Sequence, residues 1–401
     1  MRTVYLDGAA NTPLSPAALK AMQPYLSKTH MGNSMSIHSY GVSAAQAIER
    51  TRQNMSQLLR VQPTELFFTS GATESNNWAI MSTVMQWRAK HKKGGHIICS
   101  AMDHDSVLKC CQHVSKLFNI DLTIVYPDLQ HRTDQDGWWN LSELDIEPHI
   151  RPDTILICMM DVNNELGTHN DIEGITKYAY TLGIPVLVDC TQSLSLGGYR
   201  IALGTRYPRA TFMSFSAHKF YGPTGVGALI AKQPLLPLIV GGAQEGGLRG
   251  GTANTAGIVG MGAALAEVRK DDYLLHYINL TAYLNKLLEK ELPQVFYNAR
   301  RGISIISLNC SKVIHTEHLA SVLDAYGIAV SAGSACDSEH DETAGVFNGS
   351  HVLLAIGLTE EEIRNTIRIS YTRYTTKKDI KKLVKALKQI IAFQKKGASN
   401  D

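Results

Sequence analysis

The feature that most constrains the fold is a regular alternation of short apolar runs and longer segments between residues 64 and 231. Most intervals are long enough for a crossover helix, and strands that are apolar throughout belong to a sheet covered on both faces. The last two runs lie too close for a crossover, so we expect the final strand to be antiparallel. The runs lie at 66–69, 96–100, 122–126, 154–160, 184–189, 211–215 and 226–231. They predict an α/β domain around a mainly parallel sheet of seven strands.

The flanking segments complete the expected organisation. Ser15 and Pro16 have the N-cap and first-turn preferences of a helix start. A helical stretch is expected at about 256–291, followed by strands at 303–308 and 328–330 and a last helix from Lys377. The lysines of that helix fit a solvated face better than a surface for an acidic partner. We therefore predict a large domain at 15–259 and a smaller α+β domain formed by 1–14 and 260–401.

Composition narrows the classes of function. The 401 residues carry a formal net charge of +3, with 44% hydrophobic and 19% charged residues, which predicts neither nucleic-acid nor membrane binding. Seven cysteines without a C-x-x-C pair argue against a disulfide framework and a zinc site. The chain starts without the apolar core of a signal peptide, and no apolar run approaches the roughly 20 residues of a membrane span. These features predict a cytoplasmic protein.

Polar residues follow several predicted strands at the edge where an open parallel sheet binds ligands. The small residues at 70–76 form a turn that opens a helix, and the free N–H groups of such a helix start suit a phosphate. His104, Asn164, Asp189 and Gln192 follow three other runs. Each of these residues taken alone is more often an ordinary turn residue than a ligand, so the prediction of a site depends on their joint occurrence.

Lys219 follows the run at 211–215 and precedes a turn rich in glycine and proline. A lysine at the end of a buried strand either extends into solvent or is desolvated, and desolvation favours the neutral amine that forms a Schiff base with an aldehyde. A buried strand-end aspartate such as Asp189 needs a cation or donor, for which a protonated pyridine nitrogen is suited. His104 could stack on the ring, with Asn164 and Gln192 donating to its oxygen. Together these residues predict a pyridoxal phosphate site.

Seven segments distributed over nearly the whole chain resemble motifs of the cysteine desulfurases. That family belongs to the class V aminotransferase group of fold-type I pyridoxal phosphate enzymes. The segments are YLDGAANTP at 5–13, FTSGATESN at 68–76, VNNELG at 162–167, DCTQS at 189–193, SAHKFYGP at 216–223, RGGT at 249–252 and GSAC at 333–336.

The resemblance implies a role for each matching residue. Lys219 is the covalent anchor of the cofactor, His104 stacks on its ring and acts in proton transfer, and Asp189 faces the pyridine nitrogen. Asn164 and Gln192 lie near the phenolic oxygen. The residues implied as phosphate contacts are Ala72, Thr73, Ser216 and His218, with Thr252 contributed by the second subunit of a homodimer. The residues implied for the substrate are Arg368 and Asn164 for binding and Cys336 as the nucleophile.

The implied activity is conversion of L-cysteine to L-alanine, with the sulfur passed on as a Cys336 persulfide to acceptor proteins that serve iron-sulfur clusters, tRNA or DNA modification. A selenocysteine lyase, another class V aminotransferase or lyase, and a catalytically weak scaffold for sulfur acceptors remain alternatives. Gly8, Asn11 and Ser34 depart from the usual family motifs, and Asp337 begins an acidic stretch after the cysteine. Acidic neighbours disfavour a thiolate, so we expect that the Cys336 loop reacts more slowly or depends on a partner that positions it.

Overall fold

The computed structural model describes residues 3–28, 30–129, 139–271, 273–299, 302–332 and 349–397. The predicted nucleophile Cys336 lies outside these residues. Among the described residues, no helix is both long and apolar enough to cross a membrane.

The centre of the large part is a seven-stranded sheet. Pairing is parallel between β4 and β3, β3 and β5, β5 and β6, and β6 and β7, whereas β8 is antiparallel to both β7 and β2. The mainly parallel sheet and the antiparallel last strand are therefore confirmed. The order across the sheet is β2 (Leu66–Thr69), β8 (Gly227–Ala231), β7 (Phe212–Ser216), β6 (Val186–Asp189), β5 (Thr154–Met160), β3 (His96–Ser100) and β4 (Asp121–Val125).

Each central strand contributes side chains to two hydrophobic cores, because successive side chains point to opposite faces of a sheet. One core joins the sheet to Trp78 and Val107 and receives the strand residues Ile97, Leu156, Leu187 and Phe212. The other core receives the next residue of each strand, Ile98, Ile157, Val188 and Met213. This division explains why the strands are apolar throughout instead of alternating with polar residues.

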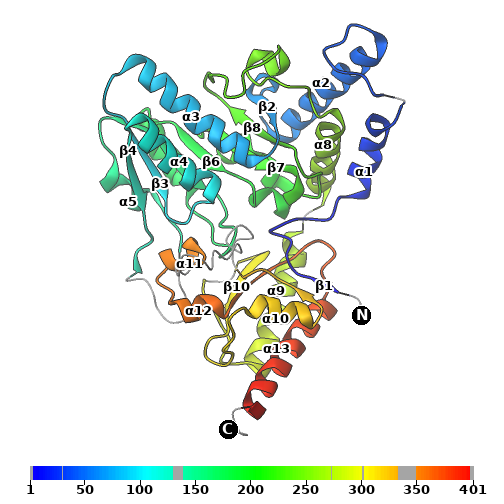
Figure 1. The fold of residues 1–401 in the computed structure, drawn as a ribbon, viewed down its shortest axis with the longest axis vertical. Helices are drawn as coiled ribbons and strands as arrows, with labels where there is room; N and C mark the ends of the chain where they lie inside the picture. Colours follow the sequence, from blue (N-terminus) through cyan, green and yellow to red (C-terminus); the bar gives the residue numbers. More distant parts are fainter. Residues whose placement is uncertain are drawn as a thin grey trace.

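Helices cover both faces of the sheet. Trp78 and Val107 belong to α3 (Ala72–Lys90) and α4 (Asp105–Phe118), which pack against each other. The helices α1 (Pro16–Met22), α2 (Ser39–Leu59) and α8 (Thr255–Lys270) pack together beside the sheet, and Figure 1 shows them at the upper right. The predicted start of α1 is confirmed, since the Ser15 side chain accepts a hydrogen bond from Ala18 N. The remaining helices of this part are α5 (Glu143–Ile146), α6 (Ile172–Thr181) and α7 (Leu203–Arg206).

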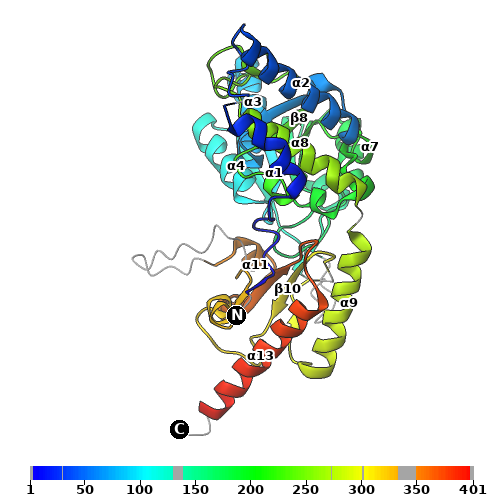
Figure 2. The ribbon, with the colours of Figure 1, turned by 90° about the vertical axis from the view of Figure 1, so that its right-hand side faces the viewer.

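The second part lies below the large sheet in Figures 1 and 2. In it β10 (Ile305–Asn309) pairs antiparallel with β12 (Thr366–Ser370) and β9 (Phe296–Tyr297), while β1 (Val4–Tyr5) pairs parallel with β11 (Ile328–Ala329). The long helices α9 (Leu274–Glu291) and α13 (Lys377–Gly397) pack against each other. The short helices are α10 (Leu319–Ala325), α11 (His351–Ala355) and α12 (Glu360–Arg364).

The helical stretch expected at 256–291 is two helices, α8 and α9. Asp271 after α8 has extended backbone angles, and its carbonyl accepts a hydrogen bond from Gly198 N at 3.0 Å, which turns the chain out of the helix. The proposed domain boundary at residue 260 falls inside α8, which packs on α1 and α2. The division into 15–259 and 1–14 with 260–401 stays a prediction.

Candidate active site

A cavity of about 270 Å³ lies where the parallel strands end. Its wall contains nearly all the residues predicted from the sequence, namely Ala72, Thr73, His104, Asn164, Asp189, Gln192, Ser216, His218, Lys219 and Arg368. The N-terminal segment adds Ala9 and Ala10, and Ser106 and Thr191 lie near the predicted residues. Thr252 is exposed and is not part of the described lining, and Cys336 lies outside the described residues.

Lys219 ends the short 3-10 turn η7 (Ala217–Lys219), which directly follows β7. Its Nζ donates to the carbonyls of Ala9 at 2.6 Å and Ala10 at 2.9 Å, so the N-terminal segment lies across the lysine. Thr12 fixes this crossing, because its N–H and hydroxyl both donate to the His218 carbonyl at 2.9 and 2.7 Å. Tyr221 has a φ of +69°, which is rare for an aromatic residue. The η7 turn thus ends β7 and places Lys219 in the cavity wall, before the chain turns back into β8, which is antiparallel to β7.

Asp189 ends β6 and is 6% exposed. Its Oδ1 accepts a hydrogen bond from Thr191 N and its Oδ2 accepts one from Asn76 Nδ2, both at 2.9 Å. A buried carboxylate that is satisfied by donors on both oxygens is held in one orientation. The strand end therefore presents a fixed negative group to the cavity.

The two histidines of the cavity are held neutral. Burial lowers the pKa of the His104 imidazole below its usual value. Its Nδ1 accepts a hydrogen bond from Ser106 N at 3.1 Å, so the remaining ring proton lies on Nε2. Burial and then the positive charge of Lys219 lower the pKa of His218 to about 4. A neutral, planar imidazole suits stacking on a ring that carries positive charge at its nitrogen.

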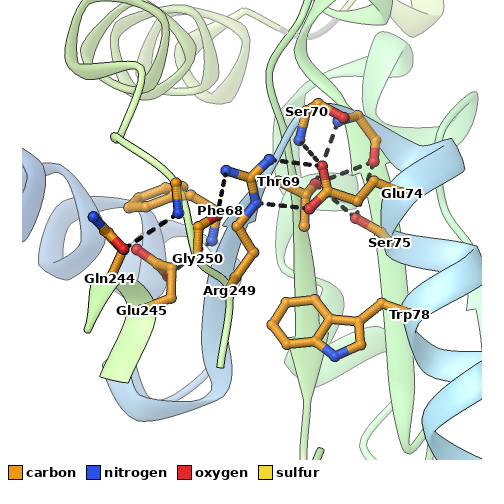
Figure 3. Close-up of polar contacts among 12 residues, drawn as sticks. Phe68, Thr69, Ser70, Glu74, Ser75, Trp78, Gln244, Glu245, Arg249 and Gly250 are labelled. Carbon is orange, nitrogen blue, oxygen red and sulfur yellow. Dashed lines mark hydrogen bonds and ion pairs between the residues drawn. The ribbon is translucent and has the colours of Figure 1, made fainter. Parts of the chain in front are cut away.

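The start of α3 forms the phosphate-type turn that the sequence predicted. Ala72 N donates to Ser216 Oγ at 2.7 Å, which joins the helix start to the end of β7. Glu74 in the same turn accepts two hydrogen bonds from Arg249, at 2.8 and 3.0 Å, and one from Ser70 N at 2.8 Å (Figure 3). Burial raises the pKa of the Glu74 carboxyl, but the hydrogen bonds from Arg249 and Ser70 outweigh burial and bring it below its usual value.

The segment that supplies Arg249 is held by a second ion pair. Glu245 accepts hydrogen bonds from Arg52 at 2.7 and 3.0 Å and from Phe68 N at 3.0 Å. Figure 3 shows Glu245 beside Phe68 while Arg249 reaches Glu74. Residues 245–249 are thus fixed against both β2 and the first turn of α3.

Arg368 enters the cavity from β12 and is 2% exposed. Its Nη1 donates to the Asn164 carbonyl at 3.0 Å, and its Nη2 pairs with Asp7 Oδ1 at 2.9 Å. The Nε of Arg368 is buried and has no hydrogen-bond partner among the described residues. The guanidinium is therefore rigidly held and retains donor capacity.

The cavity fits pyridoxal phosphate. In the described part of the chain, Asn164 Oδ1 and Thr191 Oγ1 are buried without a hydrogen-bond partner, and buried polar atoms of this kind call for a polar ligand. A helix start suits the phosphate, Asp189 suits the pyridine nitrogen, and Lys219 suits the aldehyde. The described residues contain no group of three or more His, Cys, Asp or Glu that could hold a metal ion.

Comparison with known proteins decides the family. A family model described as aminotransferase class-V matches residues 4–383. Cysteine desulfurase IscS of Dictyoglomus turgidum is 37% identical over 396 residues, which cover 97% of this chain and 95% of that protein. The chain belongs to the cysteine desulfurase group of the class-V aminotransferases. These enzymes depend on pyridoxal phosphate.

Solved structures agree with this assignment. A NifS-like protein superimposes with a TM-score of 0.84 at 28% identity, covering 98% of this chain and all of that chain (100%). A structure described as SspA in complex with cysteine has a TM-score of 0.74 at 31% identity, with coverage of 93% and 100%. The fold-type I architecture predicted from the sequence is thus confirmed.

Other residues that the sequence reasoning missed line the desulfurase cavity or hold its wall in place. Asp7 pairs with Arg368, Asn76 bonds to Asp189, and Ser106 bonds to His104. Asp7 and Asn76 stand inside two of the family-like segments, so their place in a motif was the one available signal. His351 was also missed. Its Nε2 lies 2.9 Å from the Asp103 carbonyl, beside the cavity.

Proposed function

We propose that this chain is a pyridoxal-phosphate-dependent cysteine desulfurase that converts L-cysteine to L-alanine and transfers the sulfur to Cys336 as a persulfide. The observation that carries the proposal is the convergence of Lys219, Asp189 and Arg368 on one cavity in a chain of this family. The reaction balances without a further reagent. The substrate C–S bond breaks, the sulfur joins the Cys336 thiol, and the carbon that loses sulfur gains a proton.

Lys219 holds the cofactor and moves a proton. When bound, pyridoxal phosphate supplies an electron-withdrawing ring conjugated to the substrate amine. Lys219 would anchor the cofactor through its aldehyde, and its amine, when free, would accept the proton of the substrate α-carbon. Asp189 orients and holds the positive pyridine nitrogen through its fixed carboxylate.

His104 and Arg368 act on the two ends of the substrate. His104, neutral and protonated on Nε2, exchanges a proton with the substrate thiol. Arg368 binds the substrate carboxylate, a planar anion that matches the guanidinium fork. Because Asp7 already occupies Nη2, the substrate carboxylate competes with Asp7 for the guanidinium group.

A homodimer in which Thr252 contacts the phosphate bound by the partner subunit is part of the proposal. Burial of exposed apolar side chains such as Ile37 (98% exposed), Val240 (83%) and Met31 (69%) against a second subunit would stabilise such a dimer. Thr252 is exposed and does not line the described cavity of its own subunit, so its side chain is accessible to a second subunit.

The sulfur acceptor is proposed to be a protein in a reducing cytoplasm. The cysteines within the described ranges, Cys99, Cys110, Cys111, Cys158, Cys190 and Cys310, are free and buried, which supports a reducing compartment. Burial raises the pKa of Cys110 and of Cys310 to about 12, so neither competes as a thiolate for sulfur.

One assay tests the function. Purified protein is incubated with L-cysteine, alanine and sulfide are measured, and Cys336 is examined by mass spectrometry for one added sulfur. Cys336→Ala should lose alanine formation from cysteine, and Lys219→Ala should lose both alanine formation and the visible cofactor absorbance. Undiminished turnover of selenocysteine by Cys336→Ala together with loss of cysteine turnover supports the desulfurase. Alanine formation from cysteine that survives Cys336→Ala contradicts the proposal.

A further inference from the structure

A continuous chain of buried hydrogen bonds lies behind the cavity wall and centres on Asn76 of α3. This side chain is fully buried and does not line the cavity. Its Nδ2 donates to Asp189 Oδ2 and to Ser106 Oγ, both at 2.9 Å. Its Oδ1 accepts a hydrogen bond from Ser214 Oγ at 2.5 Å. One amide therefore contacts the last residue of β6, a residue within β7 and a residue in the first turn of α4.

The orientation of the Asn76 amide follows from its partners. An ionised carboxylate accepts hydrogen bonds and donates none, so the amide atom that faces Asp189 must be the nitrogen. The Ser214 hydroxyl donates to the opposite end of the amide, which leaves no reason for a flipped amide. Both N–H groups of Asn76 are consequently directed, one to Asp189 and one to Ser106.

Ser106 carries the effect of this orientation to His104. Because Ser106 Oγ accepts from Asn76, its own proton is free to point to His104 Nδ1, which lies 2.9 Å away. The backbone N–H of Ser106 donates to the same Nδ1 at 3.1 Å. With two donors directed to Nδ1, the neutral imidazole keeps its proton on Nε2.

We propose that Asn76 is a positioning residue that couples the carboxylate of Asp189 to the hydrogen bonding and orientation of His104 through Ser106. The inference rests on the proposed function for its catalytic meaning. Asp189, which is proposed to hold the pyridine nitrogen, is then connected by hydrogen bonds to His104. His104 is the imidazole proposed to stack on the ring and exchange the thiol proton. Without Asn76, the described hydrogen bond that remains to the Asp189 carboxylate comes from the Thr191 N–H. The Ser106 hydroxyl is then free to rotate.

The neighbouring asparagine provides a matched control. Asn77 lies on the same helix, and its Nδ2 donates to the Thr73 carbonyl at 2.9 Å and to the Ser106 carbonyl at 3.2 Å. It therefore contacts the backbone of Ser106 without joining the chain from Asp189 to His104. A general loss of packing at this turn should affect Asn77→Ala and Asn76 variants alike.

The test compares Asn76→Leu, Asn76→Asp, Ser106→Ala and Asn77→Ala. The first readout is the dissociation constant of pyridoxal phosphate from the apoprotein, followed by absorbance. Asn76→Leu, which removes a hydrogen bond to a charged group, should raise this constant about tenfold or more. Asn76→Asp keeps the side-chain shape but places a second carboxylate beside Asp189, so its constant should rise as the pH increases. Asn77→Ala should stay within about twofold of wild type.

The second readout is the hydrogen bonding of His104 Nδ1, followed by the ¹⁵N resonances of histidine-labelled protein and assigned with His104→Gln. Wild type should show an unprotonated Nδ1 that accepts two hydrogen bonds, whereas in Asn76→Leu and Ser106→Ala the Nδ1 resonance should shift toward that of a more weakly hydrogen-bonded nitrogen, because the Ser106 N–H is the donor that remains directed to it. Ser106→Ala removes only the His104 arm, so its cofactor constant should change less than that of Asn76→Leu.

The outcomes separate this inference from the proposed function. If Asn76→Leu and Asn76→Asp match Asn77→Ala in both readouts, the positioning role is wrong whatever the wild type catalyses. If wild type binds pyridoxal phosphate but forms no alanine from cysteine, the proposed function fails while both readouts still test the coupling. If wild type binds no pyridoxal phosphate, the ¹⁵N readout of the apoprotein decides, and an unchanged His104 Nδ1 resonance in Asn76→Leu overturns the inference.

Discussion

The ion pair between Arg249 and Glu74 neutralises a carboxylate in the first turn of α3, where we propose that the phosphate of the cofactor binds. Glu74 shares this turn with Ala72 and Thr73, and a carboxylate there repels a bound phosphate unless it is neutralised. Arg249 supplies the neutralising charge through two hydrogen bonds of 2.8 and 3.0 Å. We therefore expect Arg249→Ala to weaken binding of pyridoxal phosphate to the apoprotein.

The size of the effect follows from the burial of the pair. An exposed ion pair contributes about 0–1 kcal/mol, and removal of one partner from a fully buried pair costs about 3–5 kcal/mol. The Arg249 and Glu74 side chains are 21% and 10% exposed, so the pair lies between these limits. We expect a loss of about 2 kcal/mol, which is about 30-fold in an equilibrium constant.

The assay is titration of each apoprotein with pyridoxal phosphate, followed by absorbance. Arg249→Lys keeps the charge without the bidentate geometry and should lie between wild type and Arg249→Ala. The double variant with Glu74→Gln removes the uncompensated charge and should recover most of the lost affinity. Arg151→Ala breaks an exposed pair with Asp153 far from the cavity and should bind like wild type. Affinity of Arg249→Ala within twofold of wild type, or a double variant as weak as Arg249→Ala, would refute the reasoning.

The pH dependence gives an independent check. Because the pKa of Glu74 is lowered in the folded protein, the stabilisation by the pair is present above the ordinary value of 4.5 and is lost as pH falls through the lowered pKa. The difference in thermal midpoint between wild type and Arg249→Ala should therefore be full at neutral pH and shrink as the pH falls below 4.5 and through the lowered pKa of Glu74. A difference that grows on acidification would contradict this sign.

Three further substitutions test other parts of the site. Burial and Lys219 lower the pKa of His218 to about 4 from an ordinary 6.5, so wild type should lose stability as pH falls between these values, and His218→Gln should show a shallower decline in thermal midpoint. Arg368→Lys should raise KM for L-cysteine about tenfold in steady-state assays, with the cofactor absorbance retained. A Cβ at Gly227 would lie 2.5 Å from the Phe215 carbonyl oxygen, so Gly227→Ala should lower the free energy of unfolding by about 1–3 kcal/mol in denaturant titrations. An unchanged pH slope, KM or denaturation midpoint would contradict the corresponding argument.

The sequence predicted the strand-end residues because position along the chain translates directly into place in a parallel sheet. Once the apolar runs are identified as parallel strands, Asp189 and Lys219 must lie at the same edge. The structure places both in the cavity wall. Their roles toward the cofactor stay proposals, since the geometry fixes where the groups lie and not what they bind.

In the small part the predicted strands at 303–308 and 328–330 are confirmed as β10 and β11, but β12, β1 and β9 were not predicted, because they do not look like buried strands. Thr366–Ser370 has an arginine at its centre, and a charged residue inside a short run indicates an exposed segment by pattern alone. In the structure all five residues are buried, because Arg368 pairs with Asp7, which is 361 positions away. Val4–Tyr5 and Phe296–Tyr297 are two-residue strands, too short to give an alternation.

The sequence alone could not identify Asn76 as the residue that hydrogen-bonds to Asp189. Whether Asn76 or Asn77 faces Asp189 depends on the rotation of α3 about its axis, which the packing of Trp78 and the rest of the helix decides. Both asparagines fit the sequence pattern equally well. A helix start predicted to within a residue or two cannot choose between adjacent side chains that point about 100° apart.

The N-terminal segment explains how the cationic and amide groups of the cavity are kept in place. Lys219 Nζ and Gln192 Nε2 both donate to the Ala9 carbonyl, at 2.6 and 3.0 Å, and the guanidinium of Arg368 pairs with Asp7. Gly8 between them leaves no room for a Cβ, which would lie 2.6 Å from the Tyr371 carbonyl oxygen. Glycine at position 8, which departs from the usual family motif, therefore allows the backbone of the N-terminal segment to pack closely against that of Tyr371. Because residues 7–9 supply the partners of three cavity side chains, ligands must compete with this segment for the same donors.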